Sequence, residues 1–170
     1  MSAMEKTIDD DDVTKNWPVK QVDLPDLDLF DLSLGELELD SPIEVASGMG
    51  KPTCFEWADD NYCELIYARN GLELDYEDGK LCYMAFFIGD DEFVPDITEL
   101  QYAELVVHNS DKKTLFNNKT TKAELIDFLG RPISEDYDSD ETILIFDFDG
   151  TCMECELNLD GMLKRINIYR

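Results

Sequence analysis

The sequence predicts an α+β protein built from two tandem repeats, each a short helix packed on an antiparallel sheet of about four strands. Three observations lead to this prediction. Two segments, residues 41–52 and 121–132, align without a gap. Each is followed by runs in which apolar and polar residues alternate, as is typical of strands. Asp-Gly pairs, which favour tight hairpin turns, separate several of these runs.

Each aligned segment has the features of a short helix. Ser41 with Glu44, and Thr121 with Glu124, have the spacing of a capping box. Pro42 suits the first helical position, because its missing N–H would have no intrahelical partner there. In both segments a Gly followed two residues later by a Pro is a stop signal. We therefore expect one helix in each segment.

Strands are expected around each helix. After the helix they cover residues 64–67, 72–76 and 81–87 in the first copy, and 142–146, 152–159 and 163–169 in the second. The expected turns include Asp78–Gly79, Asp149–Gly150 and Asp160–Gly161. A weaker strand precedes each helix, at 34–39 in the first copy and at 105–108 or 114–116 in the second. These elements divide the chain into a flexible acidic tail (1–28), a first unit (29–88), a linker (89–104) and a second unit (105–170).

The charge of the chain limits its partners. Forty acidic and fourteen basic residues give a net charge of −26 in 170 residues. Such a charge repels nucleic acids and anionic membranes and attracts basic protein surfaces. Adaptation to high salt is an alternative explanation of the acidity. Residues 29–104 hold nineteen of the acidic residues and only three basic ones, so the first unit is expected to provide the contact surface.

Acidic and aromatic residues alternate within this region, and this mixture is typical of protein interfaces, where charges steer the encounter. The residues predicted to bind a partner are Glu56, Trp57, Asp59, Asp60, Tyr62, Asp75, Tyr76, Glu77, Asp78, Asp90, Asp91 and Glu92.

The expected location is the cytoplasm. Residues 1–13 lack the apolar core of a secretory signal, and no stretch approaches the roughly 20 apolar residues of a membrane span. Five cysteines, an odd number without a secretory context, indicate reduced thiols.

Three motifs resemble catalytic or metal-binding motifs, but each lacks the neighbouring residues or structural elements that such a site requires. Ile143–Thr151 resembles the first motif of haloacid dehalogenase-type phosphotransferases, in which Asp147 would be the nucleophile and Asp149 the acid/base. That family needs a parallel α/β sheet, which the remaining residues do not predict. Asp136–Asp140 begins like a calcium loop, but Glu141 stands where glycine is needed. Cys152 and Cys155 form a C-x-x-C without a second zinc pair. We therefore expect no catalytic residues, no metal site and no cofactor.

The chain also resembles a known group of binding proteins. The matching residues are Met49–Pro52, Asp78–Leu81, Leu129–Pro132 and Asp160–Leu163. Their order is similar to that in the β-lactamase inhibitor protein fold and in bacterial toxin-immunity proteins that share a helix-plus-four-strand unit. The resemblance implies a cytoplasmic immunity protein that occludes one cognate toxin.

Together with the charge, this resemblance favours a basic nuclease toxin that is an effector of a bacterial secretion system and whose cleft is built to hold phosphates. Two alternatives remain open: a DNA-mimic regulator of a DNA-binding protein, and a phosphatase that uses Asp147 and Asp149. The oligomeric state is not predicted.

Overall fold

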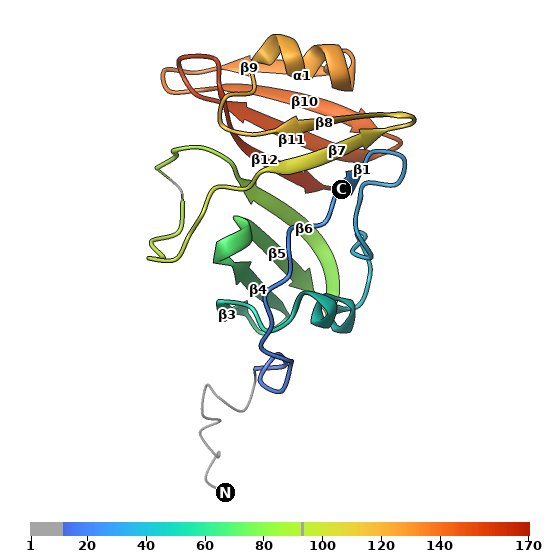
Figure 1. Ribbon diagram of the computed structural model, residues 1–170, viewed down its shortest axis with the longest axis vertical. Coiled ribbons are helices and arrows are strands. Elements are labelled where there is room, and N and C mark those ends of the chain that lie inside the picture. Colours follow the sequence, from blue (N-terminus) through green and yellow to red (C-terminus); the bar gives the residue numbers. More distant parts are fainter. Residues whose placement is uncertain (1–11, 93) are drawn as a thin grey trace, which may run out of the picture.

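The computed structural model describes residues 12–92 and 94–170, and its largest element is one antiparallel sheet of eight strands (Figure 1). In spatial order the strands are β3 (Cys54–Asp59), β4 (Tyr62–Tyr67), β5 (Leu72–Glu77), β6 (Lys80–Phe87), β12 (Leu163–Tyr169), β11 (Thr151–Leu157), β10 (Thr142–Phe148) and β9 (Ser134–Tyr137). The central pair, β6 and β12, joins strands that lie far apart in the sequence.

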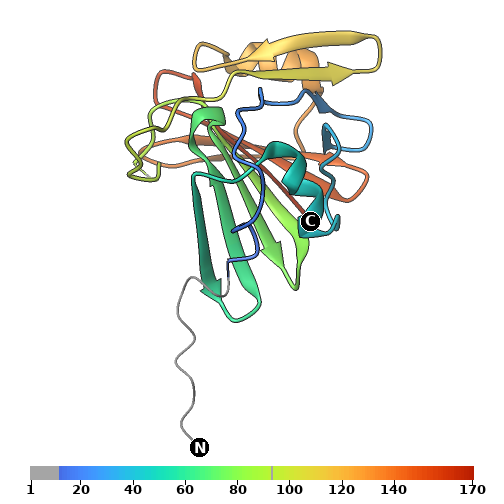
Figure 2. The same ribbon diagram turned by 60° about the horizontal axis from the view of Figure 1, so that its bottom comes forward.

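A smaller sheet has four strands in the order β2-β1-β7-β8. These are β2 (Ser33–Leu34), β1 (Leu27–Asp28), β7 (Leu105–Asn109) and β8 (Lys112–Phe116). β1 and β7 are parallel, whereas the other two pairs are antiparallel. Figure 2 shows the hairpin of β7 and β8 beside the helix α1 (Lys122–Leu129), at one end of the molecule.

The two segments predicted to be helical form two different kinds of helix. α1 has the expected capping box: the Thr121 hydroxyl accepts a hydrogen bond from the Glu124 backbone N–H, and the Glu124 carboxylate accepts one from Thr121 N–H. The first segment instead forms a 3₁₀ helix, η2 (Ile43–Met49), without a side-chain cap. Its expected cap is missing because the Ser41 hydroxyl donates to the carbonyl of Glu38. A third short helical turn, η3 (Ala68–Asn70), connects β4 to β5.

One continuous core lies on one face of the eight-stranded sheet. The smaller sheet, η2 and α1 all contribute buried side chains to it, including Leu27, Ala46, Leu105 and Leu125. The larger sheet contributes the residues that alternate toward this side, which are Cys63, Leu65, Tyr67, Leu72, Leu74, Tyr76, Met84, Phe86, Leu144, Phe146, Met153, Cys155, Leu157, Ile166 and Ile168.

The predicted fold class, α+β with two tandem helix-plus-sheet repeats, is therefore wrong. The protein is mainly β, with two large sheets in place of two separate four-stranded ones. The physical reason is the pairing of β6 with β12, which fuses the predicted sheets through backbone hydrogen bonds between Tyr83–Phe87 and Arg165–Tyr169. The smaller sheet also combines β1 with β7, one from each side of the predicted linker.

Local predictions were more successful than the global one. Asp78–Gly79, Asp149–Gly150 and Asp160–Gly161 each lie between consecutive antiparallel strands, as expected. Both residues of the first two pairs have positive φ, which explains the choice of Asp and Gly. Both alternative positions of the strand before the second helix are occupied, by β7 and β8.

The expected flexible tail, 1–28, lies partly outside the described residues. Its described part, from residue 12 onward, packs on the protein: Thr14 is fully buried and Leu27 belongs to β1. No helix among residues 12–92 and 94–170 has the length and apolar character to cross a membrane.

Candidate functional site

The second face of the eight-stranded sheet is polar. Direct cross-strand neighbours place its side chains in three rows that run across the strands. We call this surface the polar face. Its rows contain Glu56, Glu64, Asp75, Tyr83, Tyr169, Cys152 and Asp147; Cys54, Ile66, Glu73, Ala85, Asn167, Glu154, Ile145 and Ser134; and Phe87, Arg165, Glu156, Ile143 and Asp136. Arg165 is the only basic residue in these rows, so the polar face is strongly acidic.

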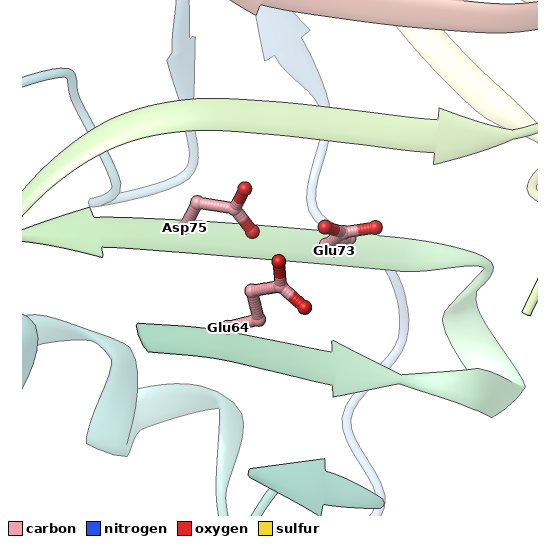
Figure 3. A group of neighbouring side chains, drawn as sticks. All are labelled: Glu64, Glu73 and Asp75. Carbon is pink, nitrogen blue, oxygen red and sulfur yellow. The ribbon is translucent and has the colours of Figure 1, made fainter. Parts of the chain in front are cut away.

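Three carboxylates converge within the first half of the polar face. Glu64 on β4 lies directly opposite Asp75 on β5, and Glu73 lies two residues before Asp75 on the same side of β5. One carboxylate oxygen from each lies within 4.8 Å of those of the other two, and Figure 3 shows the groups turned toward one another. We call these residues the carboxylate triad.

Asp75 is the most deeply buried member of the triad, with 5% of its surface exposed. The Tyr62 hydroxyl donates a hydrogen bond of 2.6 Å to its Oδ2 atom, while its Oδ1 atom is buried and accepts no hydrogen bond from a hydroxyl, amide or basic group. Burial raises the pKa of Asp75, although the bond from Tyr62 opposes the shift.

Glu73 has the largest change of acidity in the triad. Burial, followed by the negative charge of Asp75, raises its pKa from 4.5 to about 8. The pKa of Glu64 is raised as well, first by burial and then by the charge of Asp75. The triad therefore holds more negative charge than its surroundings stabilise, and a proton or another cation would relieve it.

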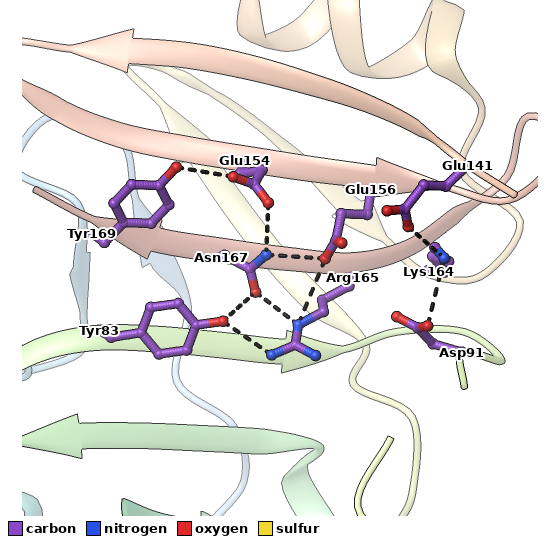
Figure 4. A network of polar contacts seen from close by, with 9 residues as sticks. All are labelled: Tyr83, Asp91, Glu141, Glu154, Glu156, Lys164, Arg165, Asn167 and Tyr169. Atoms are coloured by element: carbon purple, nitrogen blue, oxygen red, sulfur yellow. Dashed lines mark hydrogen bonds and ion pairs between the residues drawn. The ribbon is translucent and has the colours of Figure 1, made fainter. Parts of the chain in front are cut away.

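A hydrogen-bonded network occupies the other half of the polar face (Figure 4). Asn167 on β12 is its centre, with an Oδ1 atom that accepts from Tyr83 at 2.7 Å and from Arg165 Nε at 2.8 Å. Its amide nitrogen donates to Glu154 at 3.2 Å and to Glu156 at 3.0 Å. All four polar bonds of this side chain are thus used within the sheet.

Arg165 connects this network to its neighbours. Its Nη2 atom donates to the Tyr83 hydroxyl at 3.0 Å, and its Nε atom lies 3.6 Å from Glu156 Oε2. Its guanidinium also stacks 5.2 Å above the Phe87 ring. Because these contacts hold it in place, Arg165 neutralises only part of the charge around it.

A buried cation lies at the start of β12. Lys164 Nζ is 2.7 Å from a Glu141 oxygen and 3.5 Å from Asp91 Oδ1, and 8% of its side chain is exposed (Figure 4). It thereby links the segment after β6 to the start of β10.

The residues predicted to bind a partner are distributed over several surfaces. Glu56, Tyr62, Asp75 and Glu77 lie on the polar face or at its border. Tyr76 is fully buried in the core, so it is not part of any surface.

Trp57 lies on the opposite side of β3, where its ring meets Phe55 edge-on at 5.7 Å, and 40% of it is exposed. The remaining predicted residues lie at strand ends or in the connections between strands. Asp59, Asp60 and Asp78 lie at the hairpin end of β3 to β6, whereas Asp90, Asp91 and Glu92 follow β6 at the opposite end.

The sequence prediction missed much of the polar face. Its strongest omissions are Glu64, Glu73, Glu154, Glu156 and Tyr169, which belong to strands β4, β5, β11 and β12. Residues two apart in a strand share a face, so the spacing of the acidic residues could have revealed this surface. The spacing of two recurs in Glu73, Asp75 and Glu77, and again in Glu154 and Glu156.

The phosphotransferase-like motif lies in a different context from the one its family needs. Asp147 is the second-last residue of β10 and accepts a hydrogen bond from Gly150 N–H, and Asp149 occupies the turn to antiparallel β11. In the loop that begins like a calcium site, Asp138 Oδ1 accepts the backbone N–H groups of Asp140 and Glu141. Both motifs are thus used by local turns.

Comparisons with known proteins identify the fold and nothing finer. No protein-family model matches the chain, and no curated protein sequence matches it. Among solved structures, the chain is similar to a DUF4309 family protein, YjgB, from Bacillus subtilis, with a TM-score of 0.51 and 13% identity over 82% of this chain and 87% of that one. A cysteine-rich secretory protein from Staphylococcus aureus gives a TM-score of 0.42 and 9% identity over 88% of this chain and 51% of that one, too low to carry an argument.

The class defined by the fold is therefore a two-sheet protein with the architecture of YjgB. At such low identity the likeness concerns the fold alone. A likeness of fold does not test the resemblance to immunity proteins, which stays a prediction.

Proposed function

We propose that this protein binds a basic protein partner through the polar face. The observation that supports this proposal is the imbalance of charge there: carboxylates recur in all three rows, Arg165 is the only basic side chain within them, and Lys80 lies opposite Glu77 at their border. A partner that brings Lys or Arg side chains would gain from this field and would associate faster because of it.

The composition of the polar face also suits an interface. Tyr83 and Tyr169 stack with ring centroids 6.4 Å apart, near the middle of the sheet. Their hydroxyls are held by Asn167 and Glu154, so these rings are already ordered before a partner arrives. Ordered aromatic groups contribute to binding at a low cost in conformational entropy.

The biological role that fits best is that of a cytoplasmic immunity protein, whose partner is a basic toxin with nuclease activity. A nuclease cleft is cationic because it holds phosphates, and an acidic sheet would occupy it in place of nucleic acid. A DNA-mimic regulator would use the same surface but would bind several DNA-binding proteins in place of one toxin.

Affinity capture from the native organism at low salt and at 0.5 M salt would test this proposal. The captured protein and the product of the neighbouring reading frame would then be purified, and their affinities measured. The expected result is one basic partner whose nuclease activity is inhibited at equimolar ratio. Several DNA-binding partners would favour the DNA mimic, and the absence of any basic partner at low salt would refute the proposal.

Two charge-reversal variants locate the interface. Glu56→Lys changes an exposed residue of the polar face, while Asp111→Lys makes the same change in the exposed turn between β7 and β8. We expect Glu56→Lys to weaken binding at least about tenfold, in the range of a lost charge pair, and Asp111→Lys to have little effect. Equal effects would show that only the net charge matters.

A further inference from the structure

The carboxylate triad has the geometry of a cation site. Its three ligand oxygens come from neighbouring positions on two paired strands, and all lie within 4.8 Å of one another. Oxygen ligands lie about 2.3–2.6 Å from Ca²⁺, so two of them on opposite sides of the ion are separated by about 5 Å. The triad therefore already spans a distance that one such ion can bridge.

A second observation, on Asp75, points to a cation at the triad. Its Oδ1 atom is buried and accepts no hydrogen bond from a hydroxyl, amide or basic group, and Glu73 can donate to Asp75 only while it holds a proton, whose place a metal ion would take. The Tyr62 hydroxyl uses only Oδ2 and fixes the carboxylate so that Oδ1 is left for a further contact. This carboxylate belongs to a residue that is 95% buried, yet Glu64 and Glu73 beside it are partly exposed and leave a path from solvent.

We propose that Glu64, Glu73 and Asp75 bind a divalent metal ion of the hard, oxygen-preferring class, with Ca²⁺ the best fit. All three ligands are carboxylates, and neither a histidine nor a thiolate belongs to the triad, so softer ions have no advantage here. Mg²⁺ is less suitable because it requires near-ideal octahedral geometry at about 2.1 Å and gives up its water reluctantly, whereas Ca²⁺ accepts irregular sets of carboxylate oxygens. Water from the polar face completes the coordination.

The positive charge of Arg165 lowers the affinity of the triad for a cation, but its guanidinium does not occupy the place of the ion. Arg165 lowers the pKa values of Glu73 and Asp75, which shows that its field reaches the triad. Its own hydrogen bonds and ion pair are made to Tyr83, Asn167 and Glu156, however, so its guanidinium is not the donor that Oδ1 lacks. A site of moderate affinity follows from these opposing effects.

This inference is independent of the partner proposed above. Thermal unfolding of the full chain would be measured after treatment with EDTA, then in 1 mM CaCl₂ and in NaCl of equal ionic strength. The matched variants are Glu73→Gln, which removes one ligand, and Glu77→Gln, which removes the same charge from the exposed end of β5. Glu64→Gln repeats the test on β4.

We expect Ca²⁺ to raise the midpoint of the wild type and of Glu77→Gln by about 3–8 °C, as for a ligand well above its dissociation constant. Glu73→Gln and Glu64→Gln should lose most of that rise. Tb³⁺, which replaces Ca²⁺, should show luminescence sensitised by Tyr62, and Ca²⁺ should quench it.

Two results would overturn the proposal. One is a wild-type midpoint that CaCl₂ raises no more than NaCl does. The other is an equal rise in Glu73→Gln and the wild type, which would mean that the ion only screens the net charge of −26. Repeating the partner capture in EDTA separates a failure of the metal site from a failure of the proposed interface.

Discussion

Replacing Glu73 by Gln should stabilise the protein in metal-free buffer, and only above a certain pH. Burial and the charge of Asp75 raise the pKa of Glu73 to about 8 from 4.5. Between these two pH values the folded protein keeps a proton that the unfolded chain has released, so wild-type stability falls as the pH rises through this window. Gln carries no charge at any pH and is spared this loss.

The size of the effect follows from the shift. Each pKa unit corresponds to about 1.4 kcal/mol, so the full shift sets an upper bound of roughly 5 kcal/mol. Glu73 is partly exposed and shares its proton with Asp75, and both circumstances reduce the effect. We expect Glu73→Gln to increase the free energy of unfolding by about 2 kcal/mol at pH 8.5 and by almost nothing at pH 4.

Urea unfolding of both proteins in EDTA at half-unit pH steps would measure this difference, with Glu77→Gln as the control. A stability difference between Glu73→Gln and wild type that is the same at pH 4 and pH 8.5 would refute the electrostatic reasoning. A destabilised variant at pH 8.5 would refute it too, since it would mean that the Glu73 carboxylate is stabilised by its surroundings.

Three further changes test other parts of the structure by urea unfolding. Lys164→Ala should lower the free energy of unfolding by about 3–5 kcal/mol, because it removes the cation that lies between the carboxylates of Asp91 and Glu141. If the lost charge is the cause, Lys164→Met, which keeps most of the side-chain volume, should lower it by at least half as much. Gly71→Ala should cost about 2–4 kcal/mol, since φ is +60° and a Cβ would meet two backbone atoms of the strand-connecting segment at 2.6 Å; an effect below 1 kcal/mol would contradict that close approach. Thr121→Ala should cost about 1 kcal/mol by removing the cap of α1, and Thr121→Ser should restore most of it.

Sequence reasoning succeeded where the determining interactions are local. The turn at Asp78–Gly79 needs positive φ at both residues, and the residue types alone reveal this. The cap of α1 depends on two residues three positions apart. The same capping pattern failed at Ser41, because its hydroxyl found a competing carbonyl at Glu38, and that choice depends on the chain before the helix.

The continuous sheet was beyond such reasoning. Tyr83 faces Tyr169 across the β6–β12 pair, and no local pattern relates residues so distant in sequence. Nor do the two-residue strands β1 and β2 have a pattern long enough to recognise. The triad lay within reach, because alternation in β5 puts Glu73 and Asp75 on one face and Tyr76 on the other, but its third member, Glu64, required the pairing of β4 with β5.

The central position of the β6–β12 pair has a consequence during protein synthesis. Until β12 has left the ribosome, β6 has no neighbour on one side, and its backbone donors and acceptors from Tyr83 to Phe87 are unpaired there. This apolar edge would remain open while the intervening residues are translated, which takes several seconds at about 5–20 residues per second. An open edge of that kind is a template for association with other chains. The nascent protein is therefore expected to need a chaperone or rapid completion, and truncated products that end before β12 should aggregate rather than fold as half-proteins.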